Sequence, residues 1–301
     1  MKDCEIDIVS SNIEESINNL KVHGITCYRN IEKSEIFLSL QKKTHALLSN
    51  PSILGSVGYY QKDSHKRMYP GLLVGEEIFK IWLKESIIEI VEKYLKKKVM
   101  LQEIMLKHDL GDGQLYFPKH AHTGSYRTTK NEGPFSVGIL LYMHDTSEGA
   151  FCYSFGTHNW NVSHGEKIEN YPDELKLKID KNMKRVSGKA GDIILFDHRG
   201  FHGPDQPAKK ARTVYLGGMW IAEDHDFKVK CPTPIYTHML GSLSSKQLEV
   251  IGINAKGSLV DIKDFHYFSF DKQNQFFFRF VRKNLELYFK FKNFFEKFRS
   301  R

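Results

Sequence analysis

The sequence predicts an α+β fold with a mainly β core, in which an antiparallel barrel or jelly roll is preceded by helices. Over the first hundred residues the apolar positions recur at helical spacing, and from about residue 100 onward they alternate with period two. Several short strand patterns then follow one another, bounded by Gly, Asp and Asn turn signals. A helical front followed by many short strands is typical of a barrel or jelly roll with flanking helices.

The helical front contains three predicted helices and one short strand. The first helix covers residues 12–23, and the alternating segment "GITCYRNI" follows it as a strand. A second helix is expected over residues 33–48, ended by "SNPS". The third, residues 76–98, carries an apolar stripe made of Ile78, Trp82, Ile87, Ile90, Val91 and Leu95. We therefore expect residues 1–99 to form a segment that packs on the core.

The core is predicted over residues 100–225. Its strand patterns are "VMLQEIMLKHDLGDG", "FSVGILLYMHD", "GAFCYSF", "GDIILFDH" and "RTVYLGGMWIAE". Residues 165–189 mix both signs of charge, which predicts a polar insertion with a short helix. Residues 226–275 form a C-terminal extension, and the chain ends in residues 276–301.

The last 26 residues predict a basic, aromatic amphipathic helix. Apolar side chains recur there at steps of three and four, from Phe277 to Phe298, apart from Asn284. This segment holds eight Lys or Arg and two Glu, so six of the eight net positive charges lie in it. The low charge of the remaining chain argues against nucleic acid as a partner. The helix suits packing against the domain, an anionic membrane surface or a second copy of itself.

Cysteine usage and the N-terminus predict a cytoplasmic protein. Four scattered cysteines offer no disulfide or zinc framework. The first residues are acidic and polar, unlike a signal peptide, and no run of eighteen apolar residues occurs. The expected location is the cytoplasm, with the inner membrane surface as a further site through residues 276–301.

Two stretches could form a metal site. In "KHAHTGSYR" an extended chain would place His120, His122 and Gly124 on one face. In "GDIILFDHRGFHGPDQPAKKARTVYL" a strand is followed by His202 and then by Arg212. Imidazole binds iron, copper, nickel or zinc, and a buried arginine binds a carboxylate bidentately. The structural alternative is that Arg212 pairs with a core aspartate such as Asp192 or Asp197.

These stretches resemble the phytanoyl-CoA dioxygenase family. "LKVHGITCYRNI" resembles its N-terminal segment, and "GILLYMHDTSEGAFCYSFGTHNW" followed by "GDIILFDHRGFHGPDQPAKKAR" resembles its core. The resemblance covers residues 12–223 and implies a double-stranded β-helix, the cupin-like jelly roll. It also implies an Fe(II)- and 2-oxoglutarate-dependent oxygenase acting on a small molecule. In "GAFCYSFGTHNW" the family's Pro-Gly-Ser-His turn is altered, with Phe155 and Thr157 replacing the proline and serine.

The resemblance also implies roles for individual residues. His202 matches the distal iron ligand, and Arg212 matches the arginine that binds the far carboxylate of 2-oxoglutarate. The family's His-x-Asp-Thr phrase falls on residues 120–123, so His122 stands where the acid is expected and Thr123 keeps a cofactor-binding place. Five further residues lie on or beside rim strands and are candidates for contact with cofactor or substrate: Lys107, His108, Gln114, Tyr126 and Tyr142.

The missing carboxylate leaves two registers open. In the first, His120, His122 and His202 are three metal ligands, and the site is one charge unit more positive than a two-histidine, one-carboxylate site. In the second, His122 is the first ligand and Gly124 faces an open position, as in the family's halogenating relatives. His164-Gly165-Glu166 is the one His-x-acid pattern in the chain, and it lies in the polar insertion.

Three functions follow from these registers. The leading hypothesis is a dioxygenase that hydroxylates a small-molecule, carrier-bound or lipid-like substrate. The alternatives are a non-catalytic binding protein with a degenerate metal site and a His-x-Gly halogenase. The sequence does not specify the substrate, because loops and insertions determine it in such folds.

Overall fold

The computed structural model describes residues 8–29, 34–49, 59–62, 65–68, 74–115, 118–122, 134–160, 167–221, 233–235, 241–251 and 267–269. Several predicted features lie outside these residues. They are Thr123, Gly124, Tyr126, the His164–Glu166 pattern and the helix of residues 276–301. The predicted division into four segments remains a prediction.

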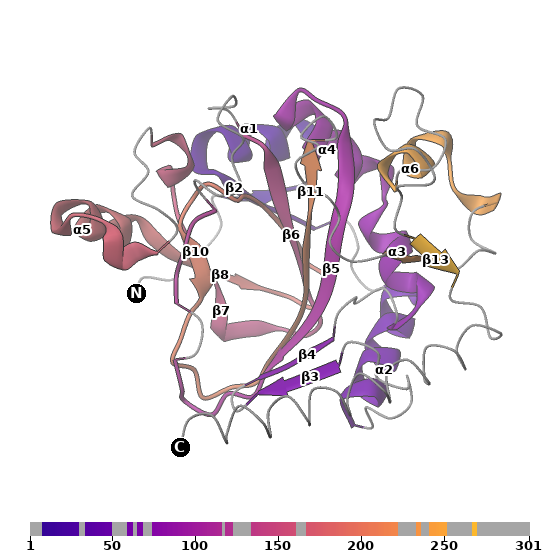
Figure 1. Ribbon diagram of the computed structural model, residues 1–301, viewed down its shortest axis with the longest axis horizontal. Helices are drawn as coiled ribbons and strands as arrows, with labels where there is room; N and C mark the ends of the chain where they lie inside the picture. Colours follow the sequence, from indigo (N-terminus) through magenta and orange to yellow (C-terminus); the bar gives the residue numbers. More distant parts are fainter. Residues whose placement is uncertain are drawn as a thin grey trace, which may run out of the picture.

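The core consists of two sheets that face each other (Figure 1). The larger has eight strands in the order β1-β2-β9-β6-β11-β5-β4-β3, and the smaller has the order β10-β7-β8. The strands of the larger sheet are β1 (Val9–Ser10), β2 (Ile25–Tyr28), β3 (Tyr59–Lys62), β4 (His65–Met68), β5 (Val99–Asp109), β6 (Ser136–Tyr142), β9 (Ile193–Asp197) and β11 (Arg212–Ile221). Those of the smaller are β7 (Thr146–Ser154), β8 (Met183–Gly188) and β10 (His202–Pro204).

The long strands pair antiparallel, so their side chains alternate between two apolar layers. One face of β11 points between the sheets with Val214 and Leu216, where it meets Leu140 of β6 and Phe196 of β9. The other face points outward with Tyr215. This arrangement is a double-stranded β-helix, as the resemblance implied, and the predicted α+β class with a mainly β core is confirmed.

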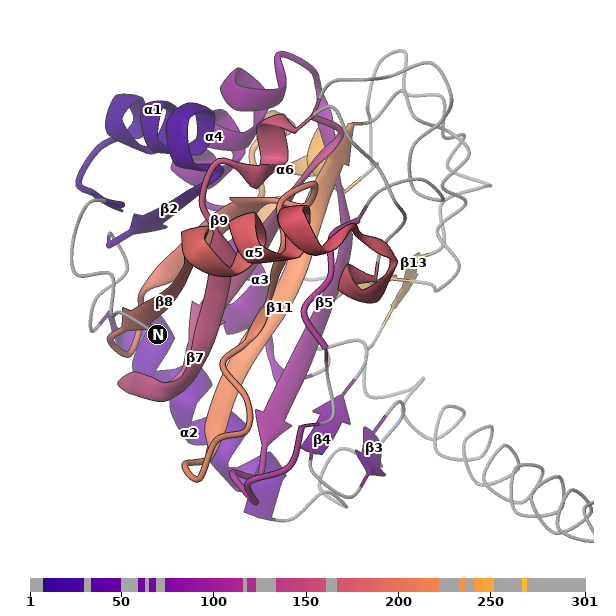
Figure 2. The same ribbon diagram turned by 90° about the vertical axis from the view of Figure 1, so that its left-hand side faces the viewer.

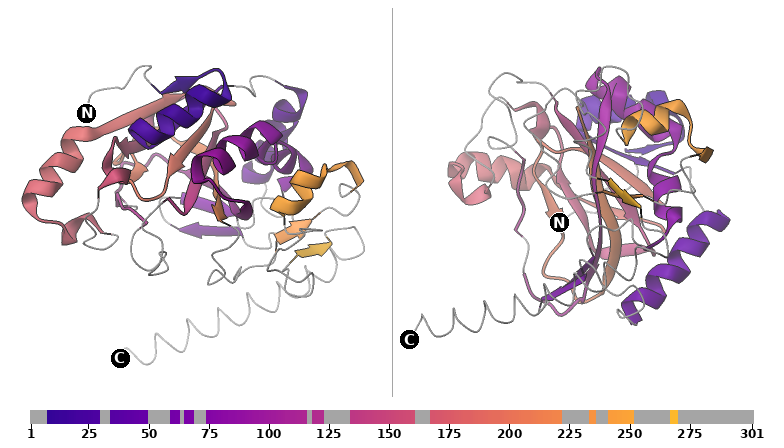
Figure 3. Two further views of the ribbon diagram at one scale, coloured as in Figure 1. Left: turned by 90° about the horizontal axis from the view of Figure 1, so that it is seen from above. Right: turned by 45° about the vertical axis from the view of Figure 1, so that its right-hand side comes forward.

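Helices cover the outer face of the larger sheet (Figure 1). They are α1 (Ile13–His23), α2 (Glu35–Ser49), α3 (Glu76–Trp82), α4 (Glu85–Leu95) and α6 (Ser245–Val250). Figure 3 shows α2, α3 and α6 on the same side of the long strands. Their buried side chains form one apolar cluster with the outer faces of β5, β6 and β11. The N-terminal helices therefore pack on the outer face of the larger sheet.

The described residues include one further helix and four further short elements. Helix α5 (Asp173–Asn182) lies across the smaller sheet in Figure 2, and its Ile179 packs with Cys152 and Met183. Residues 183–188 of the predicted polar insertion form β8, a strand of that sheet. The short elements are the 3₁₀ helices η3 (Thr157–Asn159) and η4 (Ile168–Asn170) and the paired strands β12 (Thr233–Ile235) and β13 (Tyr267–Ser269).

Helix α1 has the boundaries that its sequence predicts. The Asn12 side chain accepts a hydrogen bond from the backbone of Glu15, and Gly24 ends the helix in the left-handed region at φ 80°. Gly24 permits the turn into β2 because glycine has no Cβ to clash at positive φ. The chain thus enters the barrel directly from its first helix.

The single helix predicted over residues 76–98 is wrong, because two helices occupy this range. Helix α3 ends at Trp82, and Lys84 is extended at ψ 130° before α4 begins. The apolar stripe steps by five residues from Trp82 to Ile87, which a continuous helix cannot keep on one face. The break between the two helices realigns the apolar stripe, so that both Trp82 and Ile87 are fully buried.

Among the described residues, no helix is long and apolar enough to span a bilayer.

Candidate metal centre

Residues 118–122 run alongside β10 and bring two predicted ligands face to face. The backbones of His120 and His202 exchange both hydrogen bonds, at 2.9 and 2.8 Å, and His122 N–H donates to the His198 carbonyl. Gly203 permits this close approach, since a Cβ there would lie 3.2 Å from Cα of Lys119. The pairing therefore fixes the register between the two histidine stretches.

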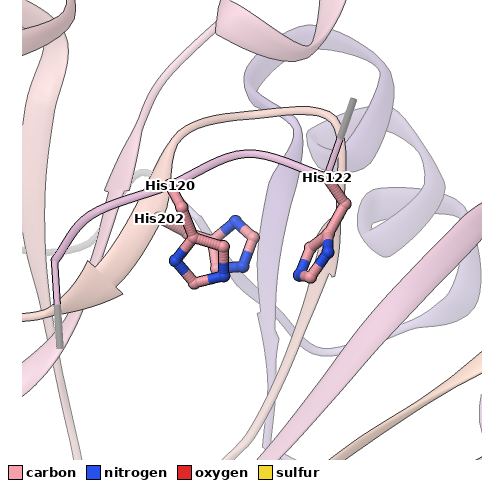
Figure 4. A group of neighbouring side chains, drawn as sticks. All are labelled: His120, His122 and His202. Atoms are coloured by element: carbon pink, nitrogen blue, oxygen red, sulfur yellow. The ribbon is translucent and has the colours of Figure 1, made fainter. Parts of the chain in front are cut away.

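Three predicted ligands converge in this region (Figure 4). One nitrogen from each of His120, His122 and His202 lies within 4.8 Å of the other two. The ring of His202 is 4.6 Å from that of His120 and 5.3 Å from that of His122, measured between centroids. Among the described residues, no carboxylate belongs to this group.

The orientation of His202 is set by a backbone carbonyl. Its Nδ1 lies 2.8 Å from the Gly200 oxygen, and its side chain is buried, with 5% exposed. A carbonyl oxygen only accepts, so Nδ1 carries the proton and Nε2 keeps its lone pair. This is the arrangement in which a histidine binds a metal through Nε2 while its other nitrogen is held in place.

Burial keeps these imidazoles neutral. It lowers the pKa of His122 to about 3, with the neighbouring His120 as a smaller cause, and it lowers the pKa of His202 well below its usual value. A neutral imidazole has the free lone pair that a metal ion needs. At neutral pH both side chains are therefore ready to bind a metal without first losing a proton.

The three nitrogens suit a divalent transition-metal ion. Metal–imidazole bonds are about 2.1 Å long, which places adjacent ligand nitrogens about 3 Å apart. The rings must therefore close by up to roughly 2 Å around an ion, and rotation about two side-chain bonds covers this distance. Three neutral nitrogen ligands on one side of the ion leave further coordination positions for an anionic ligand.

A fourth histidine, which the sequence analysis missed, lies beside the group. His198 directly follows strand β9, and its ring is 4.8 Å from that of His122. Its Nδ1 is 2.7 Å from Ser136 Oγ, and burial lowers its pKa well below the usual value. The sequence held a signal, because His198 follows Phe196 by two positions and so shares its inward face.

Arg212 enters the same interior at the start of β11. Arg212 is 3% exposed, and it lies on the same face of β11 as Val214. Val214 packs in one apolar cluster with Phe196, and the ring of Phe196 is 4.8 Å from that of His202. Nη2 of Arg212 donates to Asp109 Oδ2 at 2.5 Å. Its buried Nε and Nη1 have no hydrogen-bond partner among the described residues. Such unsatisfied donors are costly, which indicates a site for an anion.

The aspartate beside Arg212 is not one that the sequence analysis considered. Asp192 lies instead 3.4 Å from Arg29 Nε, and Asp197 binds Arg199. Asp109 engages a single nitrogen of Arg212. The guanidinium presents five N–H donors, so it retains enough of them to hold a second carboxylate.

A buried lysine adds positive charge next to this arginine. Lys107 is 4% exposed, and its Nζ lies 3.5 Å from Asp109 Oδ1. Burial is the main cause that lowers the pKa of Lys107 to about 7; Asp109 opposes this shift, and the nearby Arg212 and Arg67 contribute to it. Two cations thus face one carboxylate in the barrel interior. Arg212 also lines a small pocket that is open to solvent, together with Asp109, Asp112, Gln114, Gln206 and Lys210.

The remaining predicted rim residues have other environments. Tyr142 points inward, but its hydroxyl donates to the Val186 carbonyl and accepts from the Phe151 backbone. His108 lies on the opposite face of β5, where its Nδ1 is 2.8 Å from Thr213 Oγ1. Gln114 is exposed and lines the small pocket beside Arg212.

The fold matches several solved iron and 2-oxoglutarate enzymes. A structure described as EctD from S. alaskensis with 2-oxoglutarate and 5-hydroxyectoine shares 14% identity and a TM-score of 0.57, over 74% of this chain and 84% of that one. The epimerase SnoN in complex with Fe3+, alpha ketoglutarate and nogalamycin RO shares 12% identity and a TM-score of 0.55, over 70% and 84%.

A third similar structure is HygX from Streptomyces hygroscopicus, with nickel and 2-oxoglutarate bound. It shares 17% identity and a TM-score of 0.50, over 69% of this chain and 87% of that one. Identities this low show the fold alone. A comparison with curated protein sequences finds no match.

The family model described as phytanoyl-CoA dioxygenase (PhyH) matches residues 23–206, more than half of the chain. Enzymes of this class use iron and 2-oxoglutarate as cofactors, in agreement with the ligands of the similar structures. The matched range contains the three converging histidines and ends shortly before Arg212. The chain therefore belongs to the phytanoyl-CoA dioxygenase family, and with it to the Fe(II)- and 2-oxoglutarate-dependent oxygenases.

Proposed function

We propose that this protein is a dioxygenase that hydroxylates a small-molecule, carrier-bound or lipid-like substrate at a three-histidine iron centre. The observation that carries the proposal is the convergence of His120, His122 and His202 in one interior with a buried, partly unsatisfied Arg212. Neutral imidazoles suit Fe(II), and an arginine with unused N–H donors suits a carboxylate.

Each residue has a distinct role in this proposal. His120, His122 and His202 hold the iron, and Arg212 binds the far carboxylate of 2-oxoglutarate. Lys107 adds a second positive charge for the dianion, and Thr123 contacts the cofactor as the family phrase implies. Bound iron and 2-oxoglutarate supply the oxidising power for hydroxylation, since oxygen is reduced as 2-oxoglutarate loses carbon dioxide to give succinate.

The position of His120 supports the three-histidine register over the His-x-Gly register. His120 lies directly opposite His202 in the antiparallel pairing, and their rings are neighbours. If His122 were the first ligand, His120 would lie beside the iron without binding it. The His-x-Gly register predicts a product that depends on chloride, whereas the three-histidine register predicts a hydroxylated product without chloride.

The substrate class rests on two kinds of support. The similar structures include complexes with 5-hydroxyectoine and nogalamycin RO, both small molecules. The barrel interior around His202 is lined with aromatic rings, among them Phe151, Tyr153 and Phe196. An apolar lining of this kind favours a substrate with an apolar part.

Anaerobic titration of Fe(II) and 2-oxoglutarate tests the proposal. We expect the weak visible charge-transfer band of the chelate in the full-length protein, saturating at one iron per chain. His202→Ala should abolish the band, because it removes the most buried ligand. His45→Ala is the matched control, since His45 is exposed on α2, and should leave the band unchanged.

The rival function is a non-catalytic binding protein on the same fold. It predicts that iron content stays near zero after reconstitution and that His120→Ala leaves ligand binding unaltered. Absence of the band in the wild-type protein, together with absence of succinate, would contradict the dioxygenase and favour this rival.

The cytoplasmic location and the contacts of residues 276–301 remain predictions from the sequence. The basic, aromatic pattern favours peripheral contact with an anionic inner-membrane surface or self-association.

A further inference from the structure

The turn that carries His202 is held by a fully buried aspartate. Asp197 ends β9, and its backbone N–H donates to Gly24 at 2.8 Å. Its carboxylate accepts from the Arg199 backbone at 2.8 Å and from two nitrogens of the Arg199 guanidinium. A buried charge is stable only when it is paired and hydrogen-bonded. The Asp197–Arg199 pair therefore fixes the start of the turn.

One further donor to Asp197 comes from outside the barrel. The hydroxyl of Tyr94, on helix α4, donates to Asp197 Oδ2 at 2.7 Å. Burial raises the pKa of Tyr94 above its usual range, with the charge of Asp197 as a second cause, so the hydroxyl stays protonated and acts as the donor. Helix α4 thus contacts the end of β9 from the outer face of the larger sheet.

The inner side of the turn is held by Tyr153 on β7. Its hydroxyl donates to the Asp197 carbonyl at 2.8 Å, and its ring lies parallel to that of His202, 15° apart in plane. A Cβ at Gly200 would collide with the Tyr153 hydroxyl, so only glycine fits at this position. The Gly200 carbonyl cannot shift without displacing these contacts.

The hydrogen bonds lead without interruption to the metal ligand. Gly200 N–H donates to the Asp197 carbonyl at 3.2 Å, and the Gly200 carbonyl accepts from Nδ1 of His202 at 2.8 Å. The Nε2 lone pair of His202 is therefore aimed by a turn whose first residue is held by Tyr94. Partners of a metal-binding histidine typically change metal affinity by about 10- to 100-fold when removed.

We propose that Tyr94 is a positioning residue for the metal ligand His202, acting through Asp197 and the Gly200 carbonyl. This inference rests on the proposed three-histidine centre. It makes helix α4, which lies outside the barrel, part of the support of that centre. Tyr94 touches neither metal nor substrate, so its effect is on the geometry and affinity of the site.

Tyr94→Phe tests this inference, with Tyr215→Phe as the matched control. Both tyrosines are buried, and the Tyr215 hydroxyl is 2.8 Å from Thr44 Oγ1 on α2, on the outer face of β11. Each change removes one buried tyrosine hydroxyl and keeps the ring. In Tyr94→Phe, Asp197 retains Arg199, so no buried carboxylate is left unpaired.

Co(II) binding to the full-length protein is measured by competition with a chromophoric chelator and by the visible d–d spectrum. We expect Tyr94→Phe to raise the Co(II) dissociation constant about tenfold and to shift the spectrum. Tyr215→Phe should leave both at the wild-type values. Thermal unfolding of each apoprotein reports any loss of stability separately.

The possible failures are distinguishable. If wild-type protein binds Co(II) and Tyr94→Phe has the same affinity and spectrum, the role of Tyr94 is overturned and the metal centre stands. An equal shift in Tyr94→Phe and Tyr215→Phe also overturns it, because the effect would then be general loss of stability. If wild-type protein binds no metal, the proposed centre fails, and the inference fails with it.

Discussion

At the scale of single residues, burial determines the chemistry of the site. It keeps His122 and His202 neutral, so that they offer lone pairs, and it makes the charge of Lys107 sensitive to pH near neutrality. Asp109 lies between Lys107 and Arg212 and balances one of their two charges. An incoming dianion therefore meets one uncompensated positive charge as long as Lys107 is protonated.

We predict that affinity for 2-oxoglutarate falls as pH rises from 6 to 8. Lys107 loses its proton across its pKa of about 7, while His122 and His202 stay neutral throughout and do not contribute. If binding of the dianion raises this pKa by about one unit, the affinity falls about fivefold between pH 6 and pH 8. Titration of the anaerobic Fe(II) protein at several pH values measures the change.

Lys107→Arg and Lys107→Met provide the controls for this prediction. Arginine keeps its charge, so the affinity should become independent of pH. Methionine removes the charge, so the affinity should be low at every pH. A wild-type affinity that does not vary between pH 6 and 8 would contradict the role of Lys107.

At the scale of secondary-structure elements, the site depends on a close contact between β10 and residues 118–122. His120 and His202 belong to segments about eighty residues apart, and their backbones meet because Gly203 leaves room for Lys119. The sequence indicated that both histidine stretches could contribute to a metal site, and it predicted most of the neighbouring strands. It did not predict the pairing between them, because register depends on partners distant in the chain.

Replacing Gly203 should therefore disrupt the metal site. A valine at this position would press its branched side chain against the backbone of Lys119 and move residues 118–122 away from β10. We expect Gly203→Val to weaken Co(II) binding by about tenfold or more, because His120 then separates from His202. Competition with a chelator measures this loss.

Gly241→Ala is the matched control for Gly203→Val. A Cβ at Gly241 would meet no atom within 4 Å, so this change should leave Co(II) affinity unaltered. Wild-type affinity in Gly203→Val would show that the close contact does not position the ligands.

At the scale of the whole molecule, alternation and helical spacing were enough to predict the class of fold. The barrel interior was only partly predictable. Arg212 was expected there, but its partner Asp109 was not, since a β5 residue becomes its neighbour only through pairing with β11. His198 shares the inward face of Phe196, but it was missed because it belongs to no His-x-His or His-x-acid pattern. The break between α3 and α4 was visible only as a five-residue step in the apolar stripe.

The total charge of the barrel interior bears on the absence of an acid from the group of three histidines. In the proposed centre, three neutral histidines would leave the iron one charge more positive than a two-histidine, one-carboxylate set. Arg212 and Lys107 add positive charge in the same interior, and Asp109 offsets one unit of it. With that centre, the barrel as a whole would attract a dianion more strongly, and bound 2-oxoglutarate would supply the negative charge that a carboxylate ligand supplies elsewhere.

The most direct test of this account is X-ray absorption at the iron edge of the full-length protein loaded with Fe(II) and 2-oxoglutarate. We predict scattering from three imidazole ligands in the wild-type protein and from two in His120→Ala. Two imidazoles in the wild-type protein, with no change in His120→Ala, would contradict the three-histidine centre.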